Sequence, residues 1–168
     1  MTTTRNQDGE MLIGGVPVSR IAAEFGTPVY IYDETTLRAR ASAVRDAFKQ
    51  AWPDSQVVYA AKAFGSLAVM RIFHEEGLGI DVVSGGKLFA ALRAGMSPSM
   101  MTFHGNNKGI EELNEALDAG VGLIAVDNDL ELEMLEELGT GRGIRIPVLL
   151  RINPGIDVHA SEDRHGGQ

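Results

Sequence analysis

The sequence lacks several features that would point to common classes of protein. It contains no cysteine, which excludes disulfide bonds and thiolate metal sites within its 168 residues. No stretch approaches the ~20 apolar residues of a membrane-spanning helix, and the first residues lack the apolar centre of a signal peptide. Lys and Arg number 15 against 23 Asp and Glu, so the net charge is -8. Such a charge argues against a protein that binds nucleic acid or anionic membranes, and we expect a cytoplasmic protein.

From residue 55 onward, short apolar runs alternate with segments that carry apolar residues at helical spacing. The runs predict strands at 57–61, 79–83, 101–104, 123–126 and 147–152. Repeated strand–helix units with short connections are typical of an α/β protein whose parallel sheet is covered by helices. The pattern fits both an open doubly wound sheet and a β/α barrel.

Chain length limits the second of these folds. An eight-stranded barrel usually needs about 250 residues and rarely fewer than about 200, whereas about five strands are expected here. A closed barrel is therefore not available to one copy of the chain. The alternatives are an open sheet and an incomplete parallel TIM-type barrel, with about five of eight strands, that is part of a longer protein.

The first 33 residues follow another pattern. Residues 1–10 are polar and without periodicity, and we expect them to be mobile. A short helix is expected from Ser19, and residues 29–32 predict a strand. Asp33 is a suitable N-cap for the next helix, whose apolar residues recur along one face. We therefore divide the chain into an N-terminal segment, 1–33, and a second part, 34–168.

Lys62 is the first candidate for chemistry. It follows a continuous apolar run, which is typical of a strand buried on both faces. A lysine at the end of such a strand loses part of its hydration, and this favours the uncharged amine that attacks carbonyl groups. The alternative is a lysine that only marks where the strand meets water.

Four stretches of sequence occur in the order and near the spacing found in one known family. They are Tyr59-Ala60-Ala61-Lys62-Ala63, Gly79-Ile80-Asp81-Val82-Val83-Ser84-Gly85-Gly86, Phe103-His104-Gly105-Asn106-Asn107-Lys108 and Arg151-Ile152-Asn153-Pro154-Gly155-Ile156-Asp157-Val158-His159. Together they resemble the pyridoxal-phosphate-dependent decarboxylases with an alanine-racemase-like barrel, and within that family the diaminopimelate decarboxylases.

This resemblance implies a fold, a reaction and a cofactor. The part 34–168 would be a portion of the pyridoxal-phosphate-binding β/α barrel, and the segment 1–33 would give a strand to a C-terminal β domain that this chain lacks. The reaction would convert meso-2,6-diaminopimelate to L-lysine and CO2, in a full-length enzyme that is a homodimer. Because later motifs of the family have no match here, we expect little or no activity from this chain alone. The alternatives are a non-catalytic pyridoxal-phosphate-binding protein and an inactive truncated product.

The resemblance also implies site residues. The lysine that matches Lys62 bonds covalently to the cofactor aldehyde, and the acid that matches Asp81 lies beside cofactor and lysine. An unpaired carboxylate within an apolar strand is costly, so a structural ion pair is the alternative for Asp81. The stretch with His104 lies near the family's active site, although a helix cap by Asn106 or Asn107 explains it equally well.

Arg151 matches an arginine close to the cofactor, and its alternative is an ion pair with a nearby acid. His159 receives no catalytic role, because Ala160 and Ser161 break the family pattern that follows it. The stretch Ser84-Gly85-Gly86 is expected to begin a helix rather than to bind phosphate. No histidine cluster with metal-ligand spacing is present, and no metal site is expected.

Overall fold

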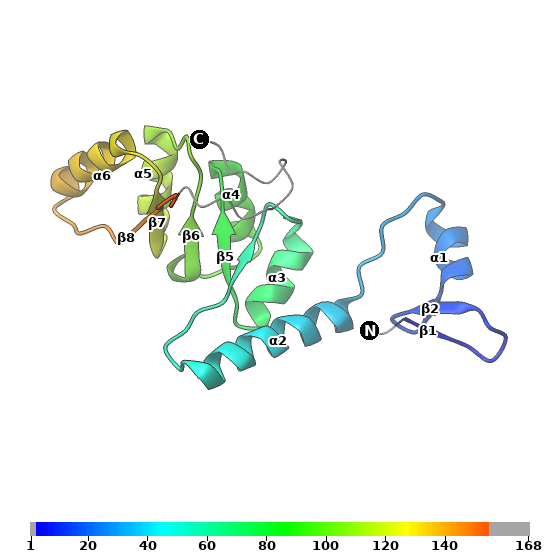
Figure 1. Ribbon diagram of the computed structural model, residues 1–168. Helices are drawn as coiled ribbons and strands as arrows, with labels where there is room; N and C mark the ends of the chain where they lie inside the picture. The colour runs from blue at the N-terminus through cyan, green and yellow to red at the C-terminus, as the bar shows by residue number, and fades with distance from the viewer. Residues whose placement is uncertain (1–2, 155–168) are drawn as a thin grey trace.

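The computed structural model describes residues 3–154, and its main body is a five-stranded parallel sheet with helices (Figure 1). The strands are β4 (Val58–Ala60), β5 (Gly79–Val82), β6 (Met101–Phe103), β7 (Leu123–Val126) and β8 (Val148–Leu150). The helices between them are α3 (Leu67–Glu75), α4 (Gly85–Arg93), α5 (Ile110–Ala119) and α6 (Asp129–Arg142), with a short 3-10 helix η1 (Pro98–Met100) before β6. All five predicted strands are present, each within two residues of its expected bounds.

The strand order separates the two folds that the sequence left open. The order is β4-β5-β6-β7-β8, with every neighbouring pair parallel. A doubly wound sheet reverses its order part-way, which places helices on both faces. Here the order never reverses, and right-handed crossovers in one direction leave the helices on one face. The sheet is therefore part of a β/α barrel, as one of the two alternatives predicted.

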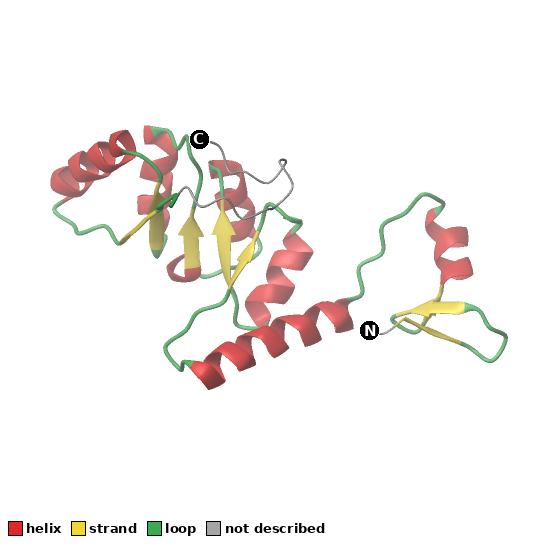
Figure 2. Ribbon diagram, viewed as in Figure 1, coloured by secondary structure: helices red, strands yellow, loops and turns green. Residues whose placement is uncertain are grey.

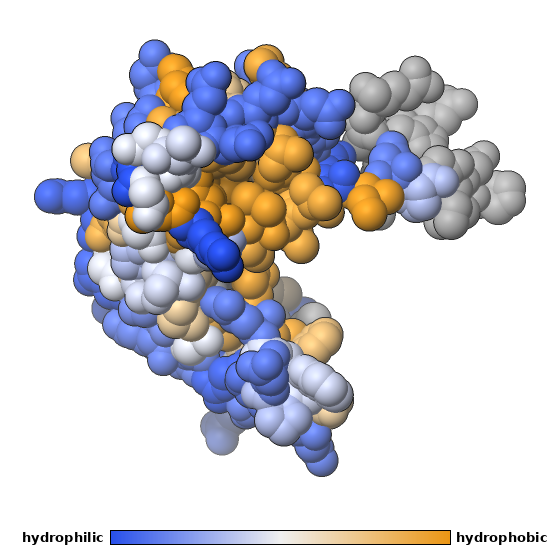
Figure 3. Space-filling model, turned by 90° about the vertical axis from the view of Figure 1, so that its left-hand side faces the viewer, coloured by the Kyte–Doolittle hydropathy of each residue, from blue (hydrophilic) through white to orange (hydrophobic). Residues whose placement is uncertain are grey.

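Side chains alternate between the two faces of this sheet. Ile80, Val82, Met101 and Phe103 point to the helices and are at most 1% exposed. Ala60, Asp81 and Thr102 are cross-strand neighbours on the opposite face. Figure 3, a view from the side where α6 and β8 lie, shows apolar side chains gathered in a hollow of the molecule.

Helix α2 (Glu34–Ala51) precedes the sheet and packs against α3. As predicted, Asp33 caps it, since its carboxylate accepts a hydrogen bond from the Thr35 N–H at 3.2 Å. The contact surface is a small apolar cluster that includes Ala41 of α2 and Phe73 of α3. Within residues 3–154, no helix combines the length and the apolar character needed to cross a membrane.

Before α2 the chain forms a small antiparallel sheet and a short helix (Figure 2). The strands are β1 (Thr3–Arg5), β2 (Met11–Ile13) and β3 (Val16–Pro17), and the helix is α1 (Val18–Phe25), close to where it was expected. Within the polar stretch 1–10, residues 3–5 form β1, whereas the mobility expected for this stretch stays a prediction. The side chain of Asn6 accepts hydrogen bonds from the N–H groups of Asp8 and Glu10, which closes the turn between β1 and β2.

The predicted strand at 29–32 is also wrong. These residues form no ladder with any described strand, and Tyr30 is 92% exposed. Residues with high strand propensity form a strand only where a neighbouring strand supplies hydrogen bonds and packing. The division into domains at residue 33 stays a prediction.

Candidate active site

The four predicted site residues lie at the same edge of the parallel sheet, with Asp81 close to His104 and Lys62, and Arg151 at the far strand β8. Lys62 lies two residues after β4, Asp81 is in β5, and His104 and Arg151 directly follow β6 and β8. Their backbones are fixed by the ladder, because the N–H groups of His104 and Arg151 donate to Val82 O at 2.8 Å and Val126 O at 2.9 Å. The C-terminal edge of the strands is where β/α barrels place their active sites.

Asp81 is the most constrained of these residues. Its side chain is 18% exposed, and its Oδ1 atom is buried without a hydrogen-bond partner among residues 3–154. The Nδ1 atom of His104 lies 3.8 Å from Oδ1, which is too long for a hydrogen bond. Burial raises the pKa of the Asp81 carboxyl above its ordinary value, while the nearby charges of His104 and Lys62 partly lower it. The structural ion pair considered for Asp81 therefore lacks hydrogen-bonded geometry.

Lys62 is exposed, although its surroundings are ordered by hydrogen bonds. The preceding Ala61 is completely buried, and its N–H donates to Asp81 O at 3.0 Å. The expected loss of hydration at Lys62 is wrong, because β4 is the edge strand of the described sheet and Val58 within it is 37% exposed. A fixed backbone with an accessible amine nevertheless suits a group that must be reached by a cofactor.

The loop after Lys62 is held by two aromatic residues. The Tyr59 hydroxyl donates to Phe64 O at 3.0 Å. The ring of Phe64 also stacks on the ring of Tyr32, from the segment before α2. Burial raises the pKa of Tyr59, so its hydroxyl keeps the proton that it donates.

Arg151 pairs with an acid that the sequence analysis missed. Its Nη1 atom lies 2.6 Å from Oδ1 of Asp127, the residue that directly follows β7. This is the ion pair that was considered as the alternative for Arg151. Asp127 had a detectable signal, since it follows an apolar strand as the predicted site residues do. The pair brings a residue from β7 into the same edge.

Two further charged residues are buried near this edge, where α5 and α6 begin. Lys108 and Glu131 are the buried charged residues of the part that the structure describes, with 4% and 2% exposure. The sequence analysis included Lys108 in a motif without a role and did not single out Glu131. The helix cap by Asn106 or Asn107 is wrong, because α5 begins after Gly109.

The beginning of α4 is occupied by protein groups. Ser84 caps the helix, as its hydroxyl accepts from the Lys87 N–H at 3.3 Å. The Glu112 carboxylate accepts from the Gly85 N–H at 2.7 Å, where an anion would otherwise bind. A negative carboxylate at this position repels phosphate, which agrees with the structural role expected for this stretch.

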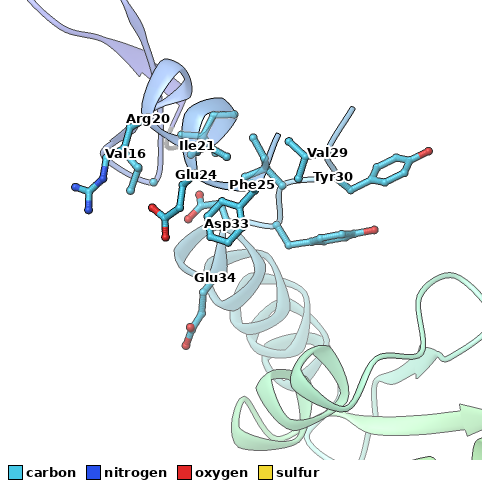
Figure 4. Close-up of a pocket in the computed structure, with 13 residues that line it drawn as sticks. Val16, Arg20, Ile21, Glu24, Phe25, Val29, Tyr30, Asp33 and Glu34 are labelled. Carbon is cyan, nitrogen blue, oxygen red and sulfur yellow. The ribbon is translucent and has the colours of Figure 1, made fainter. Parts of the chain in front are cut away.

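A cavity of about 560 Å³ lies away from the strand edge, next to α1. Its walls include Ile21 and Phe25 of α1 and residues 29–34, with the charged Arg20 and Glu24 at its side (Figure 4). None of the four predicted site residues lines it. It is therefore separate from the candidate active site.

The side chains at the strand edge suit a cofactor that carries an aldehyde and also a positively charged or hydrogen-donating group. The Lys62 amine is accessible for a covalent bond to the aldehyde. The buried Asp81 oxygen has no partner within residues 3–154 and can accept a hydrogen bond from such a group. No group of three or more His, Cys, Asp or Glu side chains in that range has the arrangement of a metal site.

Comparison with known proteins identifies the family. The model of the pyridoxal-dependent decarboxylase family, pyridoxal binding domain, matches residues 35–168. This chain is a member of that family. The predicted family and its cofactor, pyridoxal phosphate, are thereby confirmed.

Relatives of this chain include diaminopimelate decarboxylases. The one from Bacillus subtilis is 46% identical over 99% of this chain, and the one from Synechocystis is 44% identical over 96%. The crystal structure of the M. jannaschii diaminopimelate decarboxylase in co-complex with L-lysine superposes with a TM-score of 0.82, at 30% identity over 92% of this chain. The chain spans 38%, 36% and 37% of these three proteins, respectively.

Proposed function

We propose that this chain carries the cofactor-anchoring part of a diaminopimelate decarboxylase, which converts meso-2,6-diaminopimelate to L-lysine and CO2. The observation that carries the proposal is the buried Oδ1 atom of Asp81, which has no hydrogen-bond partner in the described part of the chain and lies close to the charges of Lys62 and His104. Support for the substrate comes from the names of the relatives and from the L-lysine bound to the M. jannaschii enzyme. Because the chain spans 38% or less of those proteins, substrate and activity remain proposals for the whole enzyme.

Pyridoxal phosphate, when bound, supplies an electron-accepting ring that stabilises the charge left as CO2 departs from an amino acid. Lys62 would hold it covalently through the side-chain amine. Asp81 would keep a negative charge next to that amine, and its partly buried carboxyl can hold or release a proton at Oδ1 as the charges around it change. Anchoring and local charge are the tasks that we propose for β4 and β5.

His104 and Arg151 would line the cofactor from the neighbouring strands. His104 lies next to Asp81, so its imidazole can exchange a hydrogen bond with that carboxylate after a small movement from 3.8 Å. Arg151 is held by Asp127 and has a half-exposed side chain that can still turn a donor toward an anionic ligand. We propose that the ion pair with Asp127 sets the position of the Arg151 guanidinium group.

Reduction trapping tests the anchor directly. The protein is mixed with pyridoxal phosphate, reduced with borohydride, digested, and the modified peptide is identified. We expect label on Lys62, whereas label spread over exposed lysines such as Lys49 would contradict the proposal. Release of CO2 from meso-diaminopimelate by the full-length enzyme, measured against L-ornithine, then tests the substrate.

The same measurements separate the alternatives. A non-catalytic pyridoxal-phosphate-binding protein would be labelled at Lys62 without releasing CO2, and an inactive product would do neither. The homodimer and the cytoplasmic location stay predictions. Sedimentation equilibrium of the full-length enzyme measures the first of them.

A further inference from the structure

A buried ion pair joins the loop before α5 to the first turn of α6, at the C-terminal edge of the sheet. Lys108 precedes α5 and Glu131 is in the first turn of α6. Their side chains are 1% and 2% exposed, and Lys108 Nζ lies 2.7 Å from Glu131 Oε2. Exposed pairs elsewhere in the chain, such as Arg142 with Asp118, lack this degree of burial.

Stability is a poor explanation for such a pair. Removing two charges from water costs several kcal/mol for each ion, roughly what their attraction returns. Apolar residues of similar volume are often neutral or more stabilising at such positions. A buried pair that is also hydrogen-bonded to backbone groups does, however, fix those groups in one arrangement.

The groups that this pair contacts adjoin the predicted site residues. Lys108 Nζ donates a second hydrogen bond to Gly105 O at 2.7 Å, and Gly105 follows His104. At a φ of 127°, Gly105 has a conformation that other residues rarely adopt, so the loop turns away directly after His104. The pair therefore holds the loop on the C-terminal side of His104.

Glu131 holds the backbone of Asp127, directly after the neighbouring strand β7. Its Oε2 atom accepts a hydrogen bond from the Asp127 N–H at 2.9 Å, and its Oε1 atom accepts from the Lys108 N–H at 3.3 Å. Asp127 in turn holds Arg151 at 2.6 Å. One carboxylate thus connects the loop after β6 with the Asp127–Arg151 pair.

We propose that Lys108 and Glu131 are positioning residues that set His104 and, through Asp127, Arg151 for cofactor binding. They touch neither the cofactor nor the substrate, and they act through the backbone at Gly105 and Asp127. This inference rests on the proposed function, because it assumes that the edge binds pyridoxal phosphate.

The test replaces the pair by apolar residues of similar size. In Lys108→Met/Glu131→Leu no buried charge is left unpaired, so we expect the double variant to fold. Its urea midpoint should be lower than that of the parent protein, because Asp127 N–H, Lys108 N–H and Gly105 O lose their hydrogen-bond partners. We expect its dissociation constant for pyridoxal phosphate to rise about tenfold, as for the loss of a hydrogen bond to a charged group. The control is Asp118→Asn/Arg142→Gln, an exposed pair that joins the same helices α5 and α6 at their far ends and should leave cofactor binding unchanged.

A second measurement needs no cofactor. Amide hydrogen exchange at Lys108 and Asp127, whose N–H groups donate to Glu131, should become faster in Lys108→Met/Glu131→Leu while the most protected amides of β5 and β6 keep their rates. A positioning role predicts this local change, whereas a purely structural role predicts a loss of protection throughout the sheet.

The outcomes separate this inference from the proposed function. A parent protein that is not labelled at Lys62 contradicts the proposed function and the inference with it. A parent that is labelled, together with a double variant of unchanged affinity and unchanged exchange, overturns the inference alone. A double variant that does not fold also overturns it, because the pair would then maintain the fold itself.

Discussion

The ring of Tyr32 stacks on the ring of Phe64, with centroids 4.4 Å apart and planes within 4° of parallel. Tyr32 lies in the segment before α2, and Phe64 lies in the loop that follows Lys62. Both side chains remain partly exposed, at 50% and 38%. This contact attaches the N-terminal segment to the loop that carries the candidate nucleophile.

The stack should be measurable as a coupling energy. We expect Tyr32→Leu and Phe64→Leu, alone and combined, to give a coupling of about 0.5–1.5 kcal/mol in a double-mutant cycle from urea unfolding. Phe89→Leu, an exposed phenylalanine on α4, combined with Tyr32→Leu should be additive. A coupling near zero for the stacked pair would mean that the rings contribute nothing to joining the two segments.

Replacing Lys62 should remove cofactor labelling without weakening the fold. Because the side chain is exposed, Lys62→Gln should change the free energy of unfolding by no more than about 0.5 kcal/mol. The matched control is Lys87→Gln, whose amine lies close to Gly65 in the same region. Retained labelling in Lys62→Gln, or loss of labelling in Lys87→Gln alone, would identify another lysine as the anchor.

Asp81→Asn should stabilise the fold at neutral pH and weaken cofactor binding. Burial raises the folded-state pKa of Asp81 above 3.8, so ionised Asp81 disfavours folding at pH values above the folded-state pKa. The variant should therefore gain up to about 1 kcal/mol at pH 7. The gain should shrink as the pH falls and disappear below 3.8, where the parent carboxyl is protonated in both states. Urea unfolding at several pH values checks this, and a loss of stability at pH 7 would show that attraction to Lys62 and His104 outweighs the cost of burial.

Two glycines should respond to alanine with opposite signs. A Cβ atom at Gly122 would lie 2.2 Å from Ser99 O, so Gly122→Ala should cost about 1–3 kcal/mol as the backbone moves apart. Gly141, inside α6, has open space around its Cβ position. Gly141→Ala should stabilise by about 0.5–1 kcal/mol, because glycine is a poor helix former. Thermal or urea unfolding of both variants measures the contrast.

The strand positions could be predicted because each apolar run is short and bounded by residues that interrupt it. The same reasoning failed at 29–32, where strand-forming residues find no neighbouring strand in the described part of the chain. Local propensity is visible in a sequence, whereas the presence of a partner strand is a property of the whole fold. The exposure of Lys62 was missed for the same reason, since an apolar run does not reveal that its strand lies at an edge.

The candidate site was predictable where residue type and position in the strand coincide, as for Lys62 and Asp81. Glu131 carried no such signal. An acidic residue in the first turn of a helix is ordinary, because it interacts favourably with the helix dipole. Only its burial against Lys108, from the preceding strand–helix unit, sets it apart. A contact between two strand–helix units depends on how they pack, and it produces no periodic pattern of residues in the sequence.

The unreversed strand order has a consequence for biosynthesis. Each strand–helix unit lies beside the one that was synthesised just before it. Every new strand can therefore pair with a strand that has already been made. Lys62, Asp81 and His104 belong to three consecutive units and can assemble on a nascent chain while the ribosome is still translating the codons for β8. Arg151 follows β8, so it is added at the same edge after these three residues and pairs with Asp127, the residue that follows β7.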